Sequence, residues 1–381
     1  MTNGKQSWQV SHQRSIQYEV VNCENIFDLR NEALLSAGRK ENARRFVIVD
    51  ANVDQYFSQA MREYFHFHKI DANIFVFPSG EENKSVDSYL HILSKLDAFP
   101  INRRDEPIIA IGGGVLTDIA GFVASSYRRG VPHIKVPTTL MGYVDASVGV
   151  KTGINFNGHK NRLGSFEPPK KVFLDREFLK TLPKRHLLNG TCEMIKLAVI
   201  KDITLFELLE LHGRACIESR FQNKMGRLIL DRSVTGMLEE LQPNLFEDDL
   251  ARKVDFGHTF SYGLETNHEA QLLHGEAVLI DILVSSIIAN SRSLLSEREL
   301  NRVFGLVTTL GIELKDNLVT PDLLWNTLEE RIYHRNGLQR VPLPKGLGQC
   351  AFINDIQFKE IQFACTTLRE WKINHEPAYE F

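Results

Sequence analysis

The first half of the chain repeats one pattern, in which a short apolar run closed by Gly, Pro, Asp or Asn precedes a segment with helical spacing. The apolar runs are rich in Val, Ile and Phe and lie at 46–49, 74–77, 108–111, 134–136 and 172–174. Helical segments at 84–96 and 117–126 alternate with them. Runs that are apolar on both faces are typical of parallel strands covered by crossover helices. We therefore expect a doubly wound, mostly parallel sheet.

The second half changes period after Pro183, where apolar residues recur at three- and four-residue spacing. The segments with this spacing are 187–200, 205–211, 225–241, 260–265, 275–289, 297–310 and 321–330. A length of 381 residues is compatible with two domains. We expect an α/β domain over residues 1–183 and a helical domain over residues 184–381, because proline ends the preceding element and the composition changes there.

Composition excludes several classes of protein. With 43% hydrophobic and 24% charged residues, the chain has the composition of a globular protein. Its net charge of -3 gives no global positive field for nucleic acid or an anionic membrane. The most apolar stretch, 277–289, contains Asp281 and is shorter than the ~18 residues of a membrane span.

Two further features predict a cytoplasmic protein. The first 14 residues are polar and lack the apolar core of a secretory signal. The 5 cysteines are odd in number and contain no CxxC pair, which favours reduced thiols over a disulfide framework or a thiolate zinc site.

Three strand exits carry residues suited to ligand binding, because ligands of open parallel sheets bind beyond the carboxyl ends of the strands. Gly112, Gly113 and Gly114 follow one strand and open a helix, as in a dinucleotide site. Their spacing is not GxGxxG, and a tight structural turn is the alternative interpretation. The other exits offer Asp50 and Asn52, and two threonines, Thr138 and Thr139; each is also compatible with a simple loop cap.

A local cationic run lies at residues 151–162, which read KTGINFNGHKNR. It contains Lys151, Lys160 and Arg162 and no acid, although Asp145 precedes it. Such a run is often a solvated loop, but its glycines and asparagines suit a backbone wrapped around a phosphorylated ligand. Arg128 and Arg129 add two further guanidinium groups nearby in the sequence.

The helical half contains a candidate metal set of Glu193, His258 and His274. Two histidines and one carboxylate with an open fourth position are common at catalytic zinc sites. Widely spaced ligands are weak evidence, since a lone histidine is more often an ordinary core or surface residue, and His268 competes for the same role. Lys196 lies three residues after Glu193, hence on the same helix face.

The motifs occur in a specific order: the glycine run with Asp118, VPTT, DASVGVKTGIN, GHKNRLG, CEMIK, DFGHTF and LLHGEAV. In this order the chain resembles the sugar phosphate cyclases of the dehydroquinate synthase superfamily, over residues 46–355. The resemblance implies an NAD-binding α/β domain, a helical domain that binds zinc or another divalent metal such as cobalt, an active site between them, and a homodimer.

The resemblance also implies roles for individual residues. The metal ligands would be Glu193, His258 and His274. The substrate would meet Asp145, Lys151, Lys160, Asn161 and Lys196. Arg129, from the same or from the partner subunit, would meet its phosphate. NAD would meet Asp50, Asn52, Glu81, Lys84, Gly113, Gly114, Asp118, Thr138, Thr139 and Thr181.

The implied reaction is redox-neutral overall. Transient oxidation of a secondary alcohol acidifies the neighbouring carbon, phosphate is eliminated, the ketone is reduced again, and an intramolecular aldol addition closes the ring. In this family the departing phosphate is thought to act as its own base.

Some residues differ from the dehydroquinate synthase pattern at positions where that enzyme binds its substrate. That enzyme holds a carboxylate with a Lys and an Arg, where this chain has Met237 and Ala251, which cannot pair with an anion. Asp255 and His334 replace an Asn and a Lys. Both changes resemble the 2-epi-5-epi-valiolone synthases, which cyclise sedoheptulose 7-phosphate, and Asp255 would accept hydrogen bonds from the hydroxyls of that sugar.

Four alternatives stay open at this point. Tyr262 stands where valiolone synthases typically have Pro, so 2-epi-valiolone is an alternative product. Synthases of demethyl-4-deoxygadusol use the same sugar. A metal-dependent polyol dehydrogenase is a third alternative, although an uncharged polyol needs no cationic run. A binding protein without catalysis is the fourth, and the intact metal set argues against it.

The metal assignment predicts that replacing His274 by Ala abolishes bound zinc, as measured by elemental analysis. The control is His268→Ala, which should retain zinc because His268 is expected to be a bystander. The opposite pattern would refute the ligand set.

Overall fold

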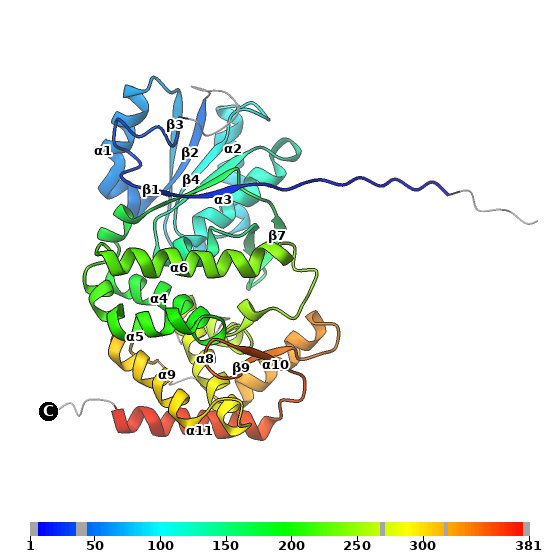
Figure 1. Ribbon diagram of the computed structural model, residues 1–381. Coiled ribbons are helices and arrows are strands. Elements are labelled where there is room, and N and C mark those ends of the chain that lie inside the picture. Colours follow the sequence, from blue (N-terminus) through cyan, green and yellow to red (C-terminus); the bar gives the residue numbers. More distant parts are fainter. Residues whose placement is uncertain (1–6, 36–43, 267–270, 316–318, 376–381) are drawn as a thin grey trace, which may run out of the picture.

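The computed structural model describes residues 7–35, 44–266, 271–315 and 319–375. It consists of an α/β part and a helical part that lie one above the other (Figure 1). All neighbouring strands of the main sheet are parallel. In spatial order they are β1 (Glu19–Cys23), β8 (Lys171–Asp175), β5 (His133–Pro137), β4 (Ile108–Gly112), β2 (Arg45–Asp50) and β3 (Ala72–Phe77).

Helices cover both faces of the sheet. In β2, Val47 and Val49 join a core with α1 (Ala51–Phe67), whereas Phe46 and Ile48 face the opposite core. That second core includes residues of α2 (Val86–Ala98) and α3 (Gly114–Ser126). Alternate residues of a strand point to opposite faces, so a strand buried on both sides reads as a continuous apolar run. The predicted doubly wound sheet is confirmed.

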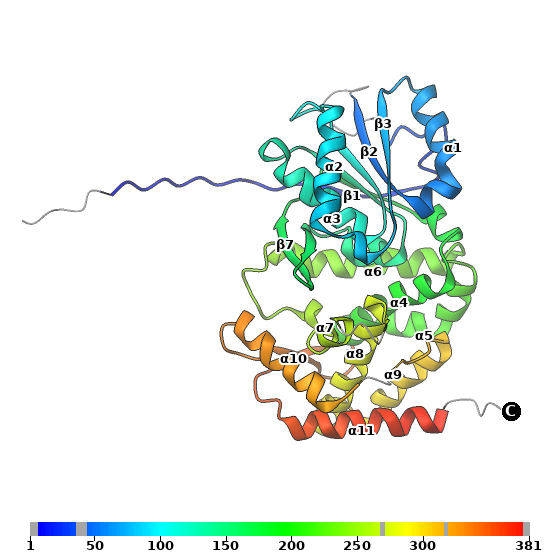
Figure 2. The ribbon, with the colours of Figure 1, turned by 180° about the vertical axis from the view of Figure 1, so that it is seen from behind.

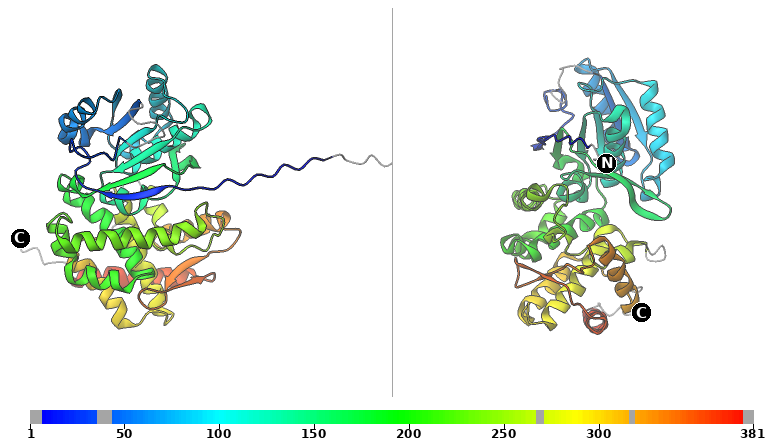
Figure 3. Two further views of the ribbon diagram at one scale, coloured as in Figure 1. Left: turned by 45° about the horizontal axis from the view of Figure 1, so that its top comes forward. Right: turned by 90° about the vertical axis from the view of Figure 1, so that its right-hand side faces the viewer.

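The helical part begins with α4 (Lys184–Ile200), which packs against α8 (His274–Ser291). Both helices are buried over most of their length, and Figure 3 shows the surrounding helices below the sheet. The other helices are α5 (Ile203–Glu218), α6 (Lys224–Leu241), α7 (Ser261–Thr266), α9 (Glu297–Leu310), α10 (Pro321–His334) and α11 (Phe358–His375). Within the described residues, no helix has the length and apolarity needed to cross a membrane.

Several elements of the structure differ from the expectation or were missed by it. The cationic run forms an antiparallel hairpin of β6 (Lys151–Phe156) and β7 (His159–Phe166), where the sequence suggested a wrapped loop. Most of β7 is exposed, so its residues lack the alternation that marks a half-buried strand. The edge strand β1, helices α1 and α11, and the pair β9 (Val341–Pro344) and β10 (Cys350–Ile353) were not predicted either.

The helix α4 approaches the loop after β5 closely at Gly190. A Cβ atom on Gly190 would lie 2.6 Å from the backbone nitrogen of Met141 and 2.6 Å from Leu140 Cβ. This contact fixes the distance between α4 and the segment that carries Thr138 and Thr139. Only glycine fits without a shift of the backbone.

We predict that Gly190→Ala lowers the thermal midpoint, because overpacking costs about 1–3 kcal/mol. The matched control is Gly305→Ala in α9, where a Cβ meets nothing within 4 Å. Alanine is the better helix former, so that variant should gain about 0.5–1 kcal/mol. Equal midpoints for the two variants would show that the approach at Gly190 is not tight.

Candidate active site

The carboxyl edge of the sheet forms an open cradle at the start of α3. Gly113 precedes this helix and supplies no side-chain cap, so the first N–H groups of α3 stay available to an anion. A Cβ on Gly113 would lie 2.9 Å from Thr139 Cγ2, and one on Gly114 would lie 3.2 Å from Ala146 Cβ. The glycines therefore let this turn pack closely against Thr139 and Ala146, next to the topological switch point between the neighbouring strands β2 and β4.

Polar side chains surround this cradle. Asp50 caps α1, and its Oδ1 accepts hydrogen bonds from the Asn52 N–H at 2.8 Å and from Ser79 Oγ at 2.6 Å. Thr138 is buried and its N–H donates to the Gly112 carbonyl. Thr181 ends the short helix after β8, and its hydroxyl donates to the Phe178 carbonyl. Ser79 was not predicted, because nothing in the sequence marks it.

A second group of side chains has the composition of a metal site. Asp145, Glu193, His258 and His274 each offer one ligand atom, and these atoms all lie within 4.8 Å of one another. Asp145 comes from the π-helix Gly142–Ala146, Glu193 from α4, His258 from the loop before α7, and His274 from the first position of α8. Residues far apart in the sequence thus meet at one point.

The buried carboxylate of Glu193 dominates the electrostatics here. Lys196 Nζ forms an ion pair with its Oε2, and His274 Nε2 lies 3.4 Å from Oε1. Burial favours the neutral acid, but the neighbouring ammonium outweighs it and holds the pKa of Glu193 well below its usual range. Burial in turn raises the pKa of Asp145 and keeps the pKa of His258 well below its usual value.

Oε1 of Glu193 is buried and makes no hydrogen bond in the described part of the chain, whereas Oε2 is engaged by the ion pair with Lys196. Nδ1 of His258 is also buried and makes no hydrogen bond there. Buried polar atoms without partners are rare in folded proteins and call for an explanation. A divalent cation would satisfy Oε1 of Glu193, and a mixed set of imidazole and carboxylate ligands suits zinc.

Glu265, on α7, was not predicted from the sequence. Its Oε1 accepts a hydrogen bond of 3.0 Å from His274 Nδ1, and its Oε2 pairs with Lys160 Nζ at 3.1 Å. Although burial opposes it, the carboxylates of Glu265 and Glu193 raise the pKa of His274 to about 10. The only hint in the sequence is an acid within the short apolar segment that follows His258.

The hairpin connects the cradle with the metal cluster. Lys84 Nζ donates to Asp118 at 2.7 Å and to Asn161 at 2.5 Å, so one ammonium links a residue of α3 with a residue of β7. Glu81 accepts from Asn155 of β6 at 2.8 Å. Figure 2 shows the hairpin extending from the sheet towards α7.

Asp255 is already engaged by two guanidinium groups. Arg252 and the buried Arg335 each donate to one of its carboxylate oxygens, at 2.5 and 3.2 Å. His334, the residue predicted for the substrate site, lies exposed on the last turn of α10, whereas its neighbour Arg335 points inwards. The role of His334 at the substrate site stays a prediction.

Lys151 and Tyr262 contact residues next to this region, whereas Arg129 lies beyond the C-terminal end of α3, away from the carboxyl edge of the sheet. Lys151 pairs with Glu247 at 2.6 Å, and Glu247 also contacts Arg252. The Tyr262 hydroxyl lies 3.5 Å from His159 of the hairpin. Arg129 follows α3 and has a positive φ of 63°, and its carbonyl accepts from Arg103. His268 lies outside the described residues.

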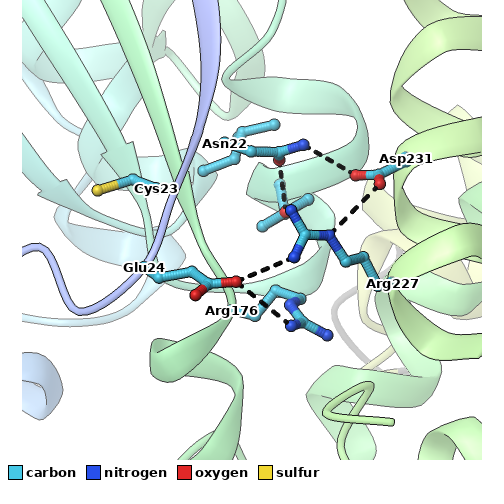
Figure 4. A pocket seen from close by; sticks show the side chains of 8 residues that line it. Asn22, Cys23, Glu24, Arg176, Arg227 and Asp231 are labelled. Atoms are coloured by element: carbon cyan, nitrogen blue, oxygen red, sulfur yellow. Dashed lines mark hydrogen bonds and ion pairs between the residues drawn. The ribbon is translucent and has the colours of Figure 1, made fainter. Parts of the chain in front are cut away.

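A separate cavity of about 310 Å³ lies between β1, the π-helix and α6 (Figure 4). Its charged groups pair with one another: Arg227 binds Glu24 at 3.0 Å, and Asn22 binds Asp231 at 2.9 Å. None of the four residues of the metal cluster lines it. The paired side chains around the cavity link β1 and the residue after it to α6.

Comparison with protein families places both halves of the chain. The family of 3-dehydroquinate synthase N-terminal domains matches residues 74–189, and that of 3-dehydroquinate synthase C-terminal domains matches residues 190–331. Together with the fold and the cluster of candidate ligands, this match defines the class. The chain belongs to the dehydroquinate synthase family of enzymes.

Individual members of this family resemble the chain over almost its whole length. The chain is 48% identical to a 2-epi-5-epi-valiolone synthase of Actinoplanes sp., over 94% of this chain and 92% of the other. It is 34% identical to a demethyl-4-deoxygadusol synthase of Trichormus variabilis, over 96% and 90%. Among solved structures, a 2-epi-5-epi-valiolone synthase from Streptomyces hygroscopicus subsp. jinggangensis with NAD+ and Zn2+ bound matches with a TM-score of 0.92 and 43% identity, over 96% of this chain and 100% of that one.

The raised pKa of His274, about 10, makes metal binding depend on pH. At pH 8 the imidazole of the metal-free protein is protonated, so a metal ion must displace this proton. We predict the release of about one proton per zinc bound at pH 8, measured by calorimetry in buffers of different ionisation enthalpy. Zinc affinity should therefore rise by up to about tenfold per pH unit between pH 7 and 9. A flat profile would contradict this protonation state.

Proposed function

We propose that this protein is an NAD- and zinc-dependent cyclase that converts sedoheptulose 7-phosphate into 2-epi-5-epi-valiolone and phosphate. The observation that carries the proposal is the similarity to 2-epi-5-epi-valiolone synthases over almost the whole chain, in sequence and in structure. Because phosphate is eliminated without net oxidation, we class the enzyme as a carbon–oxygen lyase that acts on phosphates.

The residues present fit both cofactors. Glu193, His258 and His274 would hold zinc, and the buried Oε1 of Glu193, which makes no hydrogen bond among the described residues, supports this. NAD would lie in the glycine cradle, with its phosphates at the start of α3 and its riboses near Asp50 and Asn52. When bound, zinc polarises an oxygen of the sugar, and NAD accepts a hydride and returns it.

The protein's own side chains bind and orient the sugar phosphate. We assign Lys160, Asn161 and Lys151 of the hairpin to this task, because they form a local group of cations and amides close to the metal cluster. Lys196 is buried, and although burial alone would lower its pKa, the carboxylates of Glu193 and Asp145 raise it, so it stays an ammonium. Asp145 has a raised pKa and is suited to accept and return a proton of the substrate.

The cations near Asp255 already have acidic partners, which favours a neutral substrate group. Arg252 and Arg335 contact Asp255, and Arg252 also contacts Glu247. Lys151 pairs with Glu247 as well, so none of these cations lacks a carboxylate partner. Met237, at the position of the missing lysine, is a buried apolar residue of α6. A neutral hydroxymethyl ketone fits this surrounding better than an acid.

Related products remain as alternatives. Demethyl-4-deoxygadusol synthases are represented among the relatives, at lower identity than the valiolone synthases named above. Tyr262 keeps 2-epi-valiolone as a possible configuration of the product. A polyol dehydrogenase would not need the cationic hairpin, and a binding protein without turnover would not need four converging ligand residues.

We further propose a cytoplasmic homodimer with a domain boundary after Pro183, where α4 begins. All five cysteines are free thiols, which is typical of a reducing compartment. Arg129 lies at the end of α3 and would approach the substrate phosphate from the partner subunit.

We predict that the purified enzyme with NAD and zinc releases phosphate from sedoheptulose 7-phosphate, while the absorbance of NADH stays flat. The control substrate is the carboxylated seven-carbon sugar phosphate of dehydroquinate synthase, which should release none. Growth of NADH in proportion to substrate loss would indicate a dehydrogenase. Turnover of the carboxylated sugar would refute the substrate, and NMR analysis of the ring would decide its configuration.

A further inference from the structure

Glu265 lies outside the candidate metal set and contacts both a candidate metal ligand and a candidate substrate lysine. Its side chain is only 9% exposed and reaches His274 through Oε1 and Lys160 through Oε2. His274 belongs to α8 of the helical part, whereas Lys160 belongs to the hairpin that leaves the sheet. Glu265 therefore links the helical part to a hairpin residue, Lys160, that lies 105 residues earlier in the chain.

The contact with His274 selects which imidazole nitrogen faces the cluster. Because Nδ1 donates to Glu265, its proton stays on that side, and Nε2 points towards Glu193 Oε1 at 3.4 Å. Histidine ligands of metals generally donate their second ring N–H to a carboxylate or carbonyl, which fixes the tautomer and the orientation of the ring. Glu265 provides this partner for His274.

A buried acid of α8, Asp281, holds the start of the short helix α7, which carries Glu265. Asp281 Oδ2 accepts the backbone N–H groups of Phe260 and Ser261, and its Oδ1 accepts from Ser285 Oγ at 2.9 Å. This interaction caps the start of α7, just after His258. A single charge within the apolar helix α8 thus fixes the segment between His258 and Glu265.

We propose that Glu265 is a positioning residue that orients His274 for the metal and restrains Lys160 at the substrate site. The proposal rests on the proposed zinc-dependent function and adds a residue to that site. Removing the carboxylate frees the His274 ring to rotate and leaves Lys160 without its partner. Replacing it by an amide keeps one acceptor for His274 but ends the ion pair with Lys160.

The experiment measures zinc affinity by competition with a chelator, in the absence of substrate. We expect Glu265→Ala to bind zinc about 10–100-fold more weakly than the unchanged protein. Glu265→Gln should lose less, since the amide oxygen still accepts from Nδ1. The visible spectrum of the cobalt-loaded protein should change in Glu265→Ala, because the ligand geometry changes.

Two control variants separate this role from a general effect on folding. Lys160→Met should keep zinc affinity but raise the KM for the sugar phosphate, because Lys160 does not touch the metal ligands. Glu218→Ala removes an exposed carboxylate that pairs only with Arg214 on the same helix, and should change neither quantity. If Glu265→Ala does not fold, Glu265→Gln supplies the comparison, with zinc affinity lowered several-fold.

Zinc affinity within about twofold of the unchanged protein in the folded Glu265 variants would overturn the proposal, since the expected loss is at least about tenfold on removal of the carboxylate. An unchanged cobalt spectrum would do the same. Both measurements are independent of turnover. Failure of the protein to cyclise sedoheptulose 7-phosphate would refute the proposed substrate, yet zinc binding would still decide the role of Glu265.

Discussion

The buried ion pair between Glu193 and Lys196 is the constraint on which the site depends. Both side chains lie in the interior, on one face of α4, where an unpaired charge would cost several kcal/mol. Lys196 engages only Oε2 of Glu193, and Oε1 has no hydrogen bond among the described residues. The interior therefore holds a carboxylate that is kept ionised and offers one oxygen to a cation, and His258, His274 and Asp145 converge on it.

The sequence predicted the elements whose burial follows a simple period. The strand runs and most helices fall where the apolar residues indicated, because a strand buried on both faces or a packed helix needs such residues. Strand β1 and the β6–β7 hairpin escaped prediction, since β1 has only partial burial and β7 is largely exposed. Their positions depend on partners far along the chain, such as Lys171 for Glu19.

Some residues of the candidate site were likewise predicted from the sequence, and others were missed. The resemblance supplied Glu193, His258, His274 and Asp145, which the structure brings together, although their roles stay predictions until tested. It did not supply Glu265 or Arg335, because neither belongs to a recognisable motif and their meaning comes only from the groups they contact. His334 and Arg335 illustrate the limit well: adjacent residues on one turn differ in direction, and spacing alone does not say which one points inwards.

The sequence separation of the cluster has a consequence for how the chain acquires its native state. The candidate ligand residues run from Asp145 to His274, so the cluster spans both halves of the protein. Contacts between distant residues cost more loop-closure entropy than local ones. A metal ion held by this set would therefore meet all its ligands only once the sheet and the helices have docked, and it would stabilise the finished protein without guiding its early folding.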